Sequence, residues 1–291
     1  MKISGFTIIK NAVINDYPVV EAISSILPMV DEMIVLVGDS EDETEAIIRS
    51  IPSNKIKIHN SVWDKSVNKG GKILAAETDK AFALISNESE WAFYIQADEA
   101  VHEKYHSEIL KTAALYKDDK QVDGLVFNYL HFYGSYNYIG DSRKWYNKEV
   151  RLIKNDKTIS AYRDAQGFRR NGKKLNVKPV DAYVYHYGWV KDPRQMQEKI
   201  KNSISFWQEN KEKIPLLESK DVFDYSEFDS LQKFKGTHPQ PMLARIENKN
   251  WNIELNINHK KFTAKDFLLY WFEKLTGRRL FTFRNFKMLK N

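Results

Sequence analysis

Two adjacent carboxylates follow an aromatic stretch in the first half of the chain. Residues 91–95 are rich in aromatic and β-branched side chains, and Asp98 and Glu99 come shortly after them. Such a run predicts a strand that is buried on both faces. Carboxylates at the carboxyl end of a buried strand lie where open α/β sheets bind ligands, and their oxygens suit a hard divalent cation. The pair therefore indicates a binding site, although solvated acids also end many strands.

A third carboxylate has a similar setting. The apolar run 33–37 predicts a strand, and Gly38 and Asp39 follow it directly. Gly38 permits a tight turn, so Asp39 would project from the end of the strand and could accept hydrogen bonds from a ribose or a base. The next acids, Glu41 and Glu43, are expected to cap and solvate the helix that begins near Thr44.

Cations and glycines supply a candidate phosphate site. Lys10 and Asn11 follow the first predicted strand, and Lys72 ends a loop that contains Gly70 and Gly71 just before a predicted helix. Amides and cations at a helix start can bind phosphate. The loop lacks the spacing of a Walker or dinucleotide motif, and its glycines also fit an ordinary helix start.

An alternation of strands and helices would position these groups. The predicted order is strand 3–9, helix 17–27, strand 33–37, helix 44–51, strand 55–59, helix 73–85 and strand 91–98. This rhythm predicts a parallel sheet with right-handed crossovers. Because the carboxyl ends of parallel strands meet at one edge, Asn11, Asp39 and Asp98 should converge.

Composition narrows the class of protein. The 291 residues are 42% hydrophobic and 13% aromatic, which is enough to bury a large core. The sequence contains no cysteine, which excludes disulfides, thiolate metal sites and a cysteine nucleophile. There is no apolar run long enough for a signal peptide or a membrane span, so we expect a soluble, cytoplasmic protein. The net charge of +6 favours anionic ligands.

Several motifs arrive in the order of a known family. Residues 6–12, 35–44, 68–75 and 96–98 resemble successive motifs of the family 2 glycosyltransferases, which have the GT-A fold of nucleotide-diphosphosugar transferases. The resemblance covers about residues 3–190. It implies an α/β, Rossmann-like GT-A fold: a mixed, mainly parallel sheet flanked by helices, followed here by a helical C-terminal extension.

The resemblance implies a donor site and a metal site. Gln96 stands where the family carries the first acid of its D-x-D motif, which leaves Asp98 as the conventional ligand of Mn²⁺ or Mg²⁺. His186, in the tyrosine-rich run 180–190, matches the family's second metal ligand. Because Gln96 lacks a charge, metal affinity could be reduced. The expected donor-binding residues are Lys10, Asn11, Asp39, Lys72, Gln96 and Asp98.

The resemblance also places a catalytic base. Residues 145–153 resemble a strand on the floor of the family's active site, and Asp164 stands where relatives carry the acid that deprotonates the acceptor. Glu149 and Glu99 are alternates for this role. Arg151 and Lys154 are expected to be solvated or to face phosphate.

The domain prediction divides the chain near residue 190. Residues 1–190 would form the GT-A domain, with about 1–110 binding the nucleotide sugar and 111–190 the acceptor, and residues 191–291 would form the helical extension. An amphipathic helix is expected at 194–207, and an apolar helix at 263–275 precedes a basic, phenylalanine-rich tail. This last part could contact a membrane surface, pack on the catalytic domain, or pair with a second copy in a homodimer.

The resemblance implies an inverting glycosyltransferase. It would move a sugar from a nucleotide-diphosphate sugar to a hydroxyl of a glycan or lipid-linked acceptor, in the cytoplasm or at the inner face of the membrane. The alternative is a non-catalytic subunit that binds a nucleotide sugar or serves as a scaffold, prompted by Gln96. A nucleotidyltransferase would need a glycine-rich loop after the first strand, which residues 10–14 do not provide. Nucleic-acid binding is not expected, because the cations are mixed with 39 acids.

Overall fold

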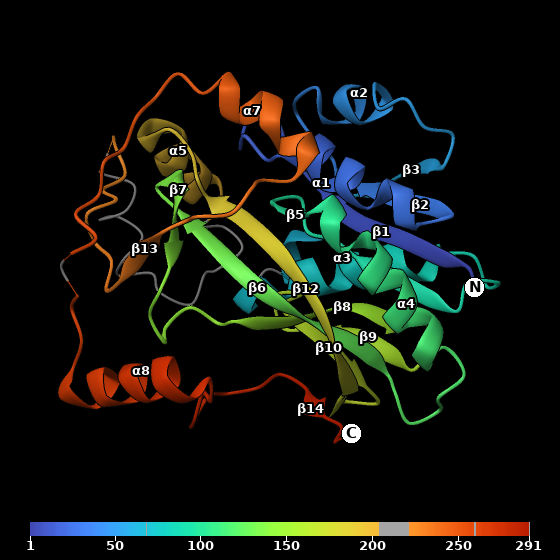
Figure 1. Cartoon of the computed structure of the whole chain (residues 1–291). Helices are drawn as coiled ribbons and strands as arrows, with labels where there is room; N and C mark the ends of the chain where they lie inside the picture. The colour runs from blue at the N-terminus through green and yellow to red at the C-terminus, as the bar shows by residue number, and fades with distance from the viewer. Residues whose placement is uncertain (68, 204–220, 259, 291) are drawn as a thin grey trace.

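A sheet with helices on both faces forms the centre of the molecule (Figure 1). The computed structural model describes residues 1–67, 69–203, 221–258 and 260–290. The start of the motif at 68–75 and the last part, 204–207, of the helix expected at 194–207 lie outside these residues. No helix in the described ranges is long and apolar enough to cross a membrane.

The strands and helices follow one another in mixed order. The strands are β1 Ile3–Ile9, β2 Glu32–Val37, β3 Ile56–Asn60, β4 Trp91–Tyr94, β5 Glu99–Val101, β6 Gly124–Tyr133, β7 Ser135–Gly140, β8 Lys148–Lys154, β9 Ile159–Tyr162, β10 Gly167–Arg170, β11 Lys173–Lys174, β12 Asn176–Trp189, β13 Leu231–Lys233 and β14 Lys287–Met288. The α-helices are α1 Val19–Ile26, α2 Thr44–Arg49, α3 Lys72–Ala83, α4 His106–Tyr116, α5 Pro193–Ser203, α7 Leu243–Glu247 and α8 Ala264–Thr276.

The first four strands of the main sheet are parallel, in the order β3-β2-β1-β4. Beyond β4 the sheet becomes mixed, because β8 pairs antiparallel with both β4 and β6. The long strand β12 runs parallel to β6, and the short β5 pairs antiparallel with β12. The predicted α/β fold with its parallel first half is confirmed, and the antiparallel strands complete it.

Alternation along the strands fills both faces of the sheet. Met33 and Val35 of β2 pack on the side of α1, whereas Ile34 and Leu36 pack on the side of α3. This period of two is the pattern of a strand that is covered on both faces. Each buried side chain of this size contributes about 1.5–3 kcal/mol to folding.

The strand predicted at 91–98 is shorter than expected. β4 ends at Tyr94, and the chain turns through Gln96 before β5 begins at Glu99. The Glu99 amide donates to the Gln96 carbonyl at 3.0 Å, and the Glu99 carboxylate accepts from the Gln96 amide at 3.0 Å. These two hydrogen bonds between Gln96 and Glu99 close the turn. The turn carries Asp98 out of the plane of β4.

Helix α4 was not predicted from the sequence. Its buried face consists of Ile109, Thr112 and Ala113. Two of these three side chains are small or polar, so the stripe is a weak apolar signal even though its spacing is helical.

The part of the chain after β12 returns to the main sheet twice. β13 pairs with β7, and β14 pairs with the beginning of β12. Between them, α7 lies near α1, and α8 lies at the edge of the molecule (Figure 1). The predicted division at residue 190 stays a prediction.

Candidate active site

A cavity of about 1470 Å³ opens at the carboxyl ends of β1 and β4. Polar groups from several elements point into it. They include Lys10 and Asn11 after β1, Gln96 and Asp98 after β4, Asp164 from the turn between β9 and β10, His186 of β12, and Lys199 and Asn202 of α5. Aromatic side chains form part of the wall, namely Tyr17, Trp63, Tyr94, Tyr133, Trp145, Trp189, Phe223 and Phe228.

Asp98 lies at the centre of the charged groups. The pairing of β5 with β12 places Glu99 opposite His186, which brings the preceding Asp98 next to the end of β12. The distance from Asp98 Oδ2 to His186 Nε2 is 3.7 Å, and to Lys199 Nζ it is 3.4 Å. Burial raises the pKa of Asp98, but nearby positive charge, which includes the Lys199 ammonium, lowers it by more, so the group is a carboxylate at pH 7.

His186 is a neutral imidazole in this setting. Burial lowers its pKa by more than the Asp98 carboxylate raises it. The ring lies 5.2 Å from the ring of His131, measured between centroids, and His186 Nδ1 has no hydrogen-bond partner among the described residues. A neutral imidazole can donate a lone pair to a metal ion.

Gly188 keeps the space beside this pair open. A Cβ atom at Gly188 would lie 2.5 Å from Asp98 Oδ2 and 2.7 Å from His186 Nε2. Any other residue would displace one or both of these side chains. The sequence therefore requires glycine here because of the space that the two functional groups occupy.

Lys199 is a site residue that the sequence analysis missed. Its ammonium group donates to the Gly188 carbonyl at 2.8 Å and lies 4.7 Å from the centre of the Tyr17 ring. Lys199 follows the buried Met196 by three residues, so it lies on the same face of α5. That spacing was a signal that could have found it, because a lysine beside an apolar stripe faces the protein interior.

A second buried lysine lies behind Lys199. Lys191 is almost fully buried, donates to the Asp16 carbonyl and lies 3.9 Å from the Asp16 carboxylate. Burial and the nearby Lys199 ammonium lower the pKa of Lys191 to about 7. Nothing in the sequence around Lys191 distinguished it from a surface lysine.

Asp164 reaches the same cavity from a tight turn. The turn includes Arg163 and Ala165, whose φ angles of 56° and 60° are in the left-handed region. The half-buried Asp164 carboxylate accepts from Gln166 Nε2 at 2.9 Å. The neighbouring Ala165 carbonyl accepts from Gln96 Nε2 at 3.4 Å, so this turn contacts the segment that carries Asp98.

Asp39 and Lys72 lie outside the lining of the cavity. Asp39 Oδ1 is 2.7 Å from Lys10 Nζ and accepts from the Trp63 amide at 3.2 Å, so it contacts two residues that do line the cavity. Lys72 is exposed on the first turn of α3 and is not among the lining residues. The structure thus groups Asp39 with Lys10 and Asn11 but leaves Lys72 apart.

Glu99 cannot serve as the alternate base. It is fully buried, and its carboxylate accepts from Arg151 Nη2 at 2.6 Å and from Arg151 Nε at 2.9 Å, as well as from the Tyr129 hydroxyl. The expectation that Arg151 is solvated or faces phosphate is wrong for the same reason. The two side chains bind each other in a buried ion pair that joins β5 to β8, so neither is available to a substrate.

The expectation for Lys154 is also wrong. Its ammonium group donates to the carbonyls of Tyr116 and Lys117 at the end of α4, and it lies 4.1 Å from the centre of the Trp91 ring. Lys154 therefore stabilises the last turn of a helix and is far from any phosphate site.

Glu149 lies in a different cavity. This second cavity, of about 800 Å³, is bounded by α8 and the C-terminal tail, and it does not include Asp98 or Asp164. Glu149 Oε2 has no hydrogen-bond partner among the described residues, and its distance to Arg151 Nη1 is 3.8 Å. Burial raises the pKa of Glu149 to about 8, so the group is mainly protonated at pH 7.

The site offers few protein ligands for a metal ion. Within the ranges that the structure describes, no three histidine, aspartate or glutamate side chains are grouped to hold an ion. Asp98 and His186 supply two donors, and the third acid expected nearby, Glu99, is bound to Arg151. A cation bound to Asp98 and His186 would take its remaining oxygen ligands from a molecule bound in the cavity.

The amino-acid sequence has no recognisable relatives in two comparisons. No family model and no curated protein sequence matches the chain. The decisive observation is therefore topological: four parallel strands in the order β3-β2-β1-β4, continued by antiparallel strands, with Asp98 just after β4. The chain has the GT-A fold.

Solved structures that are similar to this GT-A chain have low identity to it. S. aureus TarS is 16% identical, with a TM-score of 0.41 over 70% of this chain and 39% of that one. TarS 1–349 in complex with UDP is 16% identical, with a TM-score of 0.39 over 75% of this chain and 68% of that one. Glucosyl-3-phosphoglycerate synthase from Mycobacterium tuberculosis, in complex with Mn²⁺, UDP and phosphoglyceric acid, is 17% identical, with a TM-score of 0.30 over 45% and 43% of the two chains. The chain thus spans well under half of full-length TarS.

Proposed function

We propose that this chain is an inverting glycosyltransferase of family 2. It transfers a sugar from a nucleotide-diphosphate sugar to a hydroxyl group of a glycan or lipid-linked acceptor. The observation that carries the proposal is the single cavity at the carboxyl ends of β1 and β4, where Asp98, His186 and Lys199 meet and Asp164 faces the same space. Cations on one side and a carboxylate on the other are what displacement at an anomeric carbon requires.

The donor occupies the side of the cavity formed by β1 and β4. Asp39 and Asn11 hold the nucleoside, and Lys10, which pairs with Asp39 at 2.7 Å, lies next to the Trp63 ring. Gln96 supplies an amide in place of a carboxylate, for a hydroxyl or phosphate oxygen. The exposed position of Lys72 gives it at most a long-range electrostatic part in donor binding.

A divalent cation, Mn²⁺ or Mg²⁺, fits as a partner of the donor. Asp98 offers a charged oxygen and His186 a neutral nitrogen, 3.7 Å apart, and Gly188 leaves the space between them free. When bound, such a cation would stabilise the negative charge of the departing diphosphate. Lys199 places a permanent positive charge 3.4 Å from the same carboxylate oxygen. This charge opposes cation binding, as does the amide at Gln96, but it can itself stabilise the departing diphosphate.

The acceptor approaches from the aromatic wall. Trp189 and Phe223 lie 5.9 Å apart at the ring centres, and sugar rings stack well on such side chains. Asp164 takes the proton of the attacking hydroxyl, because it is a half-buried carboxylate in the lining of the same cavity, on a turn that contacts the segment carrying Asp98. Inversion follows if this single displacement occurs without a covalent intermediate. The cytoplasmic location stays a prediction.

Calorimetric titration with nucleotide diphosphates tests the donor site. We expect one nucleotide to bind with Mn²⁺ or Mg²⁺ more tightly than with EDTA, and Asp98→Ala to weaken binding by about 1–3 kcal/mol, roughly 5- to 150-fold. His186→Ala should remove the advantage of the metal. Lys199→Met should weaken the binding that remains in EDTA.

Asp118→Ala provides the matched control, since the Asp118 side chain is 90% exposed and far from the cavity. The proposal of a donor site is overturned if no nucleotide binds under any condition. Binding without release of nucleotide, in the presence of any acceptor, would favour the non-catalytic subunit.

A further inference from the structure

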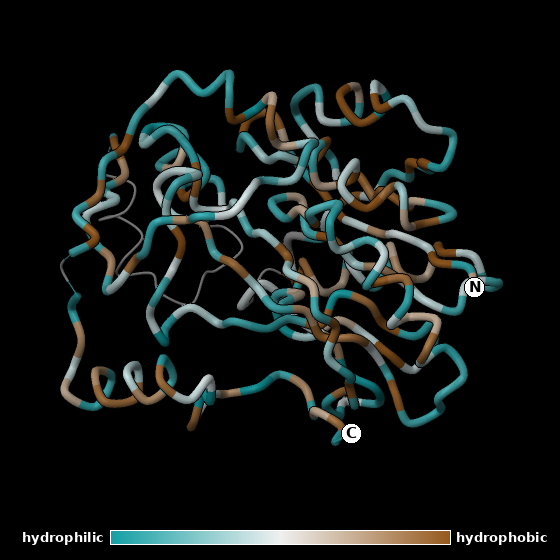
Figure 2. Tube along the Cα trace, in the orientation of Figure 1, coloured by the Kyte–Doolittle hydropathy of each residue, from teal (hydrophilic) through white to brown (hydrophobic). Residues whose placement is uncertain are grey.

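Helix α8 has an unusual attachment to the rest of the molecule. It is well formed, because the Thr263 hydroxyl accepts from the Asp266 amide at 3.1 Å at its start and Gly277, with φ 68°, ends it. Yet Tyr270 is its only buried residue. Figures 1 and 2 place this partly hydrophobic helix at the edge of the molecule, away from the sheet.

The side of α8 that faces the protein is polar. The Tyr270 hydroxyl donates to the Asp141 carboxylate at 2.6 Å, and the Lys274 ammonium donates to the same group at 2.7 Å. Glu273 forms an ion pair with Arg143 at 2.8 Å. Since Asp141 is nearly buried, these contacts fix which face of the helix points inward.

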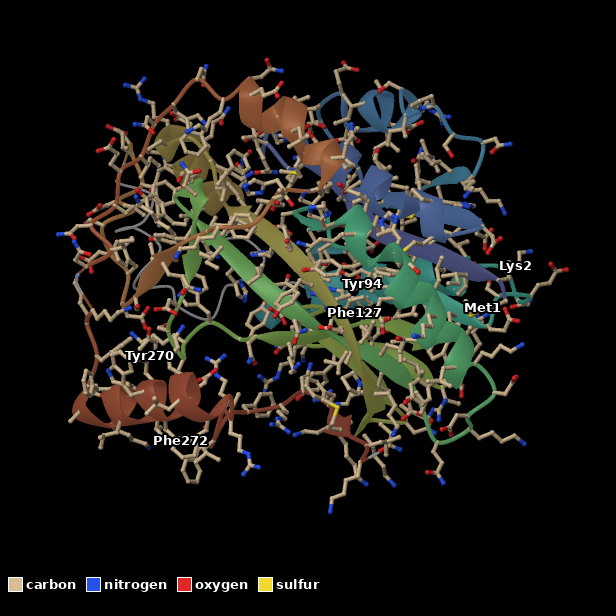
Figure 3. The ribbon with its side chains drawn as sticks, viewed as in Figure 1. Met1, Lys2, Tyr94, Phe127, Tyr270 and Phe272 are labelled. Atoms are coloured by element: carbon tan, nitrogen blue, oxygen red, sulfur yellow. The ribbon has the colours of Figure 1, made fainter. Side chains whose placement is uncertain are left out.

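The side that faces solvent is apolar. Figure 3 shows Tyr270 on the side of the molecular body and Phe272 on the opposite side. Exposed apolar side chains recur at helical spacing along that outer face: Phe267 51%, Leu268 70%, Trp271 47%, Phe272 38% and Leu275 82%. After the helix, Phe281 and Phe283 are 86% and 67% exposed. A helix on a water-soluble surface would have the reverse arrangement, so the outer face is built for an apolar partner.

The charge around this face identifies the partner. Between residues 260 and 290 the only acids are Asp266 and Glu273. Of the nine basic residues there, Lys260 and Lys274 pair with Asp141 and Arg279 pairs with Glu273. The other six are exposed, namely Lys261, Lys265, Arg278, Arg284, Lys287 and Lys290. Aromatic and leucine side chains flanked by cations suit the interface of an anionic lipid bilayer, where the rings enter the headgroup region and the cations meet lipid phosphates.

We propose that α8 and the following tail dock this chain on an anionic membrane surface. The helix has 13 residues, about 20 Å at 1.5 Å per residue, so it lies in the interface and does not span the bilayer. A second copy of the chain is a poorer occupant, because a two-fold contact would bring the same basic segments together.

Vesicle sedimentation tests the proposal without depending on enzymatic activity. The full chain should sediment with vesicles of phosphatidylglycerol and phosphatidylcholine, and much less with phosphatidylcholine alone or at high salt. The double variant Leu268→Asp with Leu275→Asp should bind the anionic vesicles at least about tenfold more weakly. Both positions are exposed, so nucleotide binding and helix content should not change.

Leu115→Asp is the matched control, since Leu115 on α4 is also 70% exposed but belongs to no apolar face. It should bind vesicles as the unaltered chain does. Equal binding by the double variant and the unaltered chain would overturn the proposal, as would no binding of the unaltered chain to anionic vesicles. A dimer in analytical ultracentrifugation that the double variant dissociates, without vesicle binding, would assign the face to a second copy instead.

Discussion

At the scale of single residues, two carboxylates that were expected to share a role occupy different environments. Asp164 faces the large cavity from a turn, whereas Glu149 is buried beside Arg151 in the other cavity. A base must be ionised and within reach of the acceptor hydroxyl. Asp164 lies in the cavity where the acceptor would bind. The raised pKa of Glu149 keeps that group mainly protonated at neutral pH, so it cannot act as the base there.

Replacement of each acid by its amide should separate the two. We expect Asp164→Asn to lower kcat by about 10²–10⁴-fold with little change in the KM of the donor, because the amide cannot accept the proton. Glu149→Gln should lower kcat less than about tenfold. Initial rates of nucleotide release measure both effects, and a larger loss in the Glu149 variant would reassign the base.

The residues that sequence reasoning could place were those at strand ends. Asp98, Asn11 and Lys10 follow strands whose apolar runs were clear, and they reach the cavity. Lys199 could have been assigned to the inner face of α5 from its spacing to Met196, but its contact with Asp98 arises from the packing of α5, and that of His131 with His186 from the pairing of β6 with β12. Such contacts join residues that are distant in the sequence.

At the scale of elements, the ion pair of Glu99 with Arg151 joins the turn that carries Asp98 to the antiparallel part of the sheet. Both side chains are buried, with 0% and 1% of their surfaces exposed. Hydrogen bonds from Arg151, from the Tyr129 hydroxyl and from the Gln96 amide satisfy the Glu99 carboxylate. Loss of one partner would leave a buried charge without compensation.

We therefore expect Glu99→Gln to lower the free energy of unfolding by about 3–5 kcal/mol. The double variant with Arg151→Met should lose less than the sum of the single variants, because no unpaired charge remains. Urea unfolding followed by circular dichroism measures these values. Additive losses would show that the two groups are energetically independent.

The boundaries of elements were predictable where one face was clearly apolar. β1 was predicted to the residue, and β2 and β3 within one residue, because their apolar runs end sharply. The turn between β4 and β5 was missed because the hydrogen bonds that close it, between Gln96 and Glu99, leave no apolar signal, and Arg151, which binds the buried Glu99 carboxylate, is more than fifty positions away. Helix α8 was predicted within one residue at each end, but the direction of its apolar face depends on Asp141, far earlier in the chain.

At the scale of the whole molecule, Glu149 should make stability depend on pH. Its pKa in the folded chain is about 8, and the ordinary value of a glutamate is 4.5. Between these values the folded state binds a proton that the unfolded state has lost, so stability from this group falls as the pH rises. It is fully present below about pH 4.5 and is lost toward pH 8 and above.

Glu149→Gln should remove this dependence. Between pH 5 and pH 9 the unaltered chain should lose on the order of 2–4 kcal/mol more than the variant does. Urea midpoints across this range provide the measurement, with the exposed Glu254→Gln as the control. Parallel curves for the unaltered chain and the Glu149 variant would show that the group does not stay protonated when folded.

Gly188 has a consequence for the mutational history of the chain. Gly172 adopts a φ of +74° with no atom near the position of a Cβ, so selection there would act on backbone conformation and asparagine could replace it. At Gly188 the restriction is purely one of volume, imposed by Asp98 and His186. Selection at position 188 would relax only after one of those two side chains had itself been replaced, so glycine should be lost second whenever a lineage abandons this site.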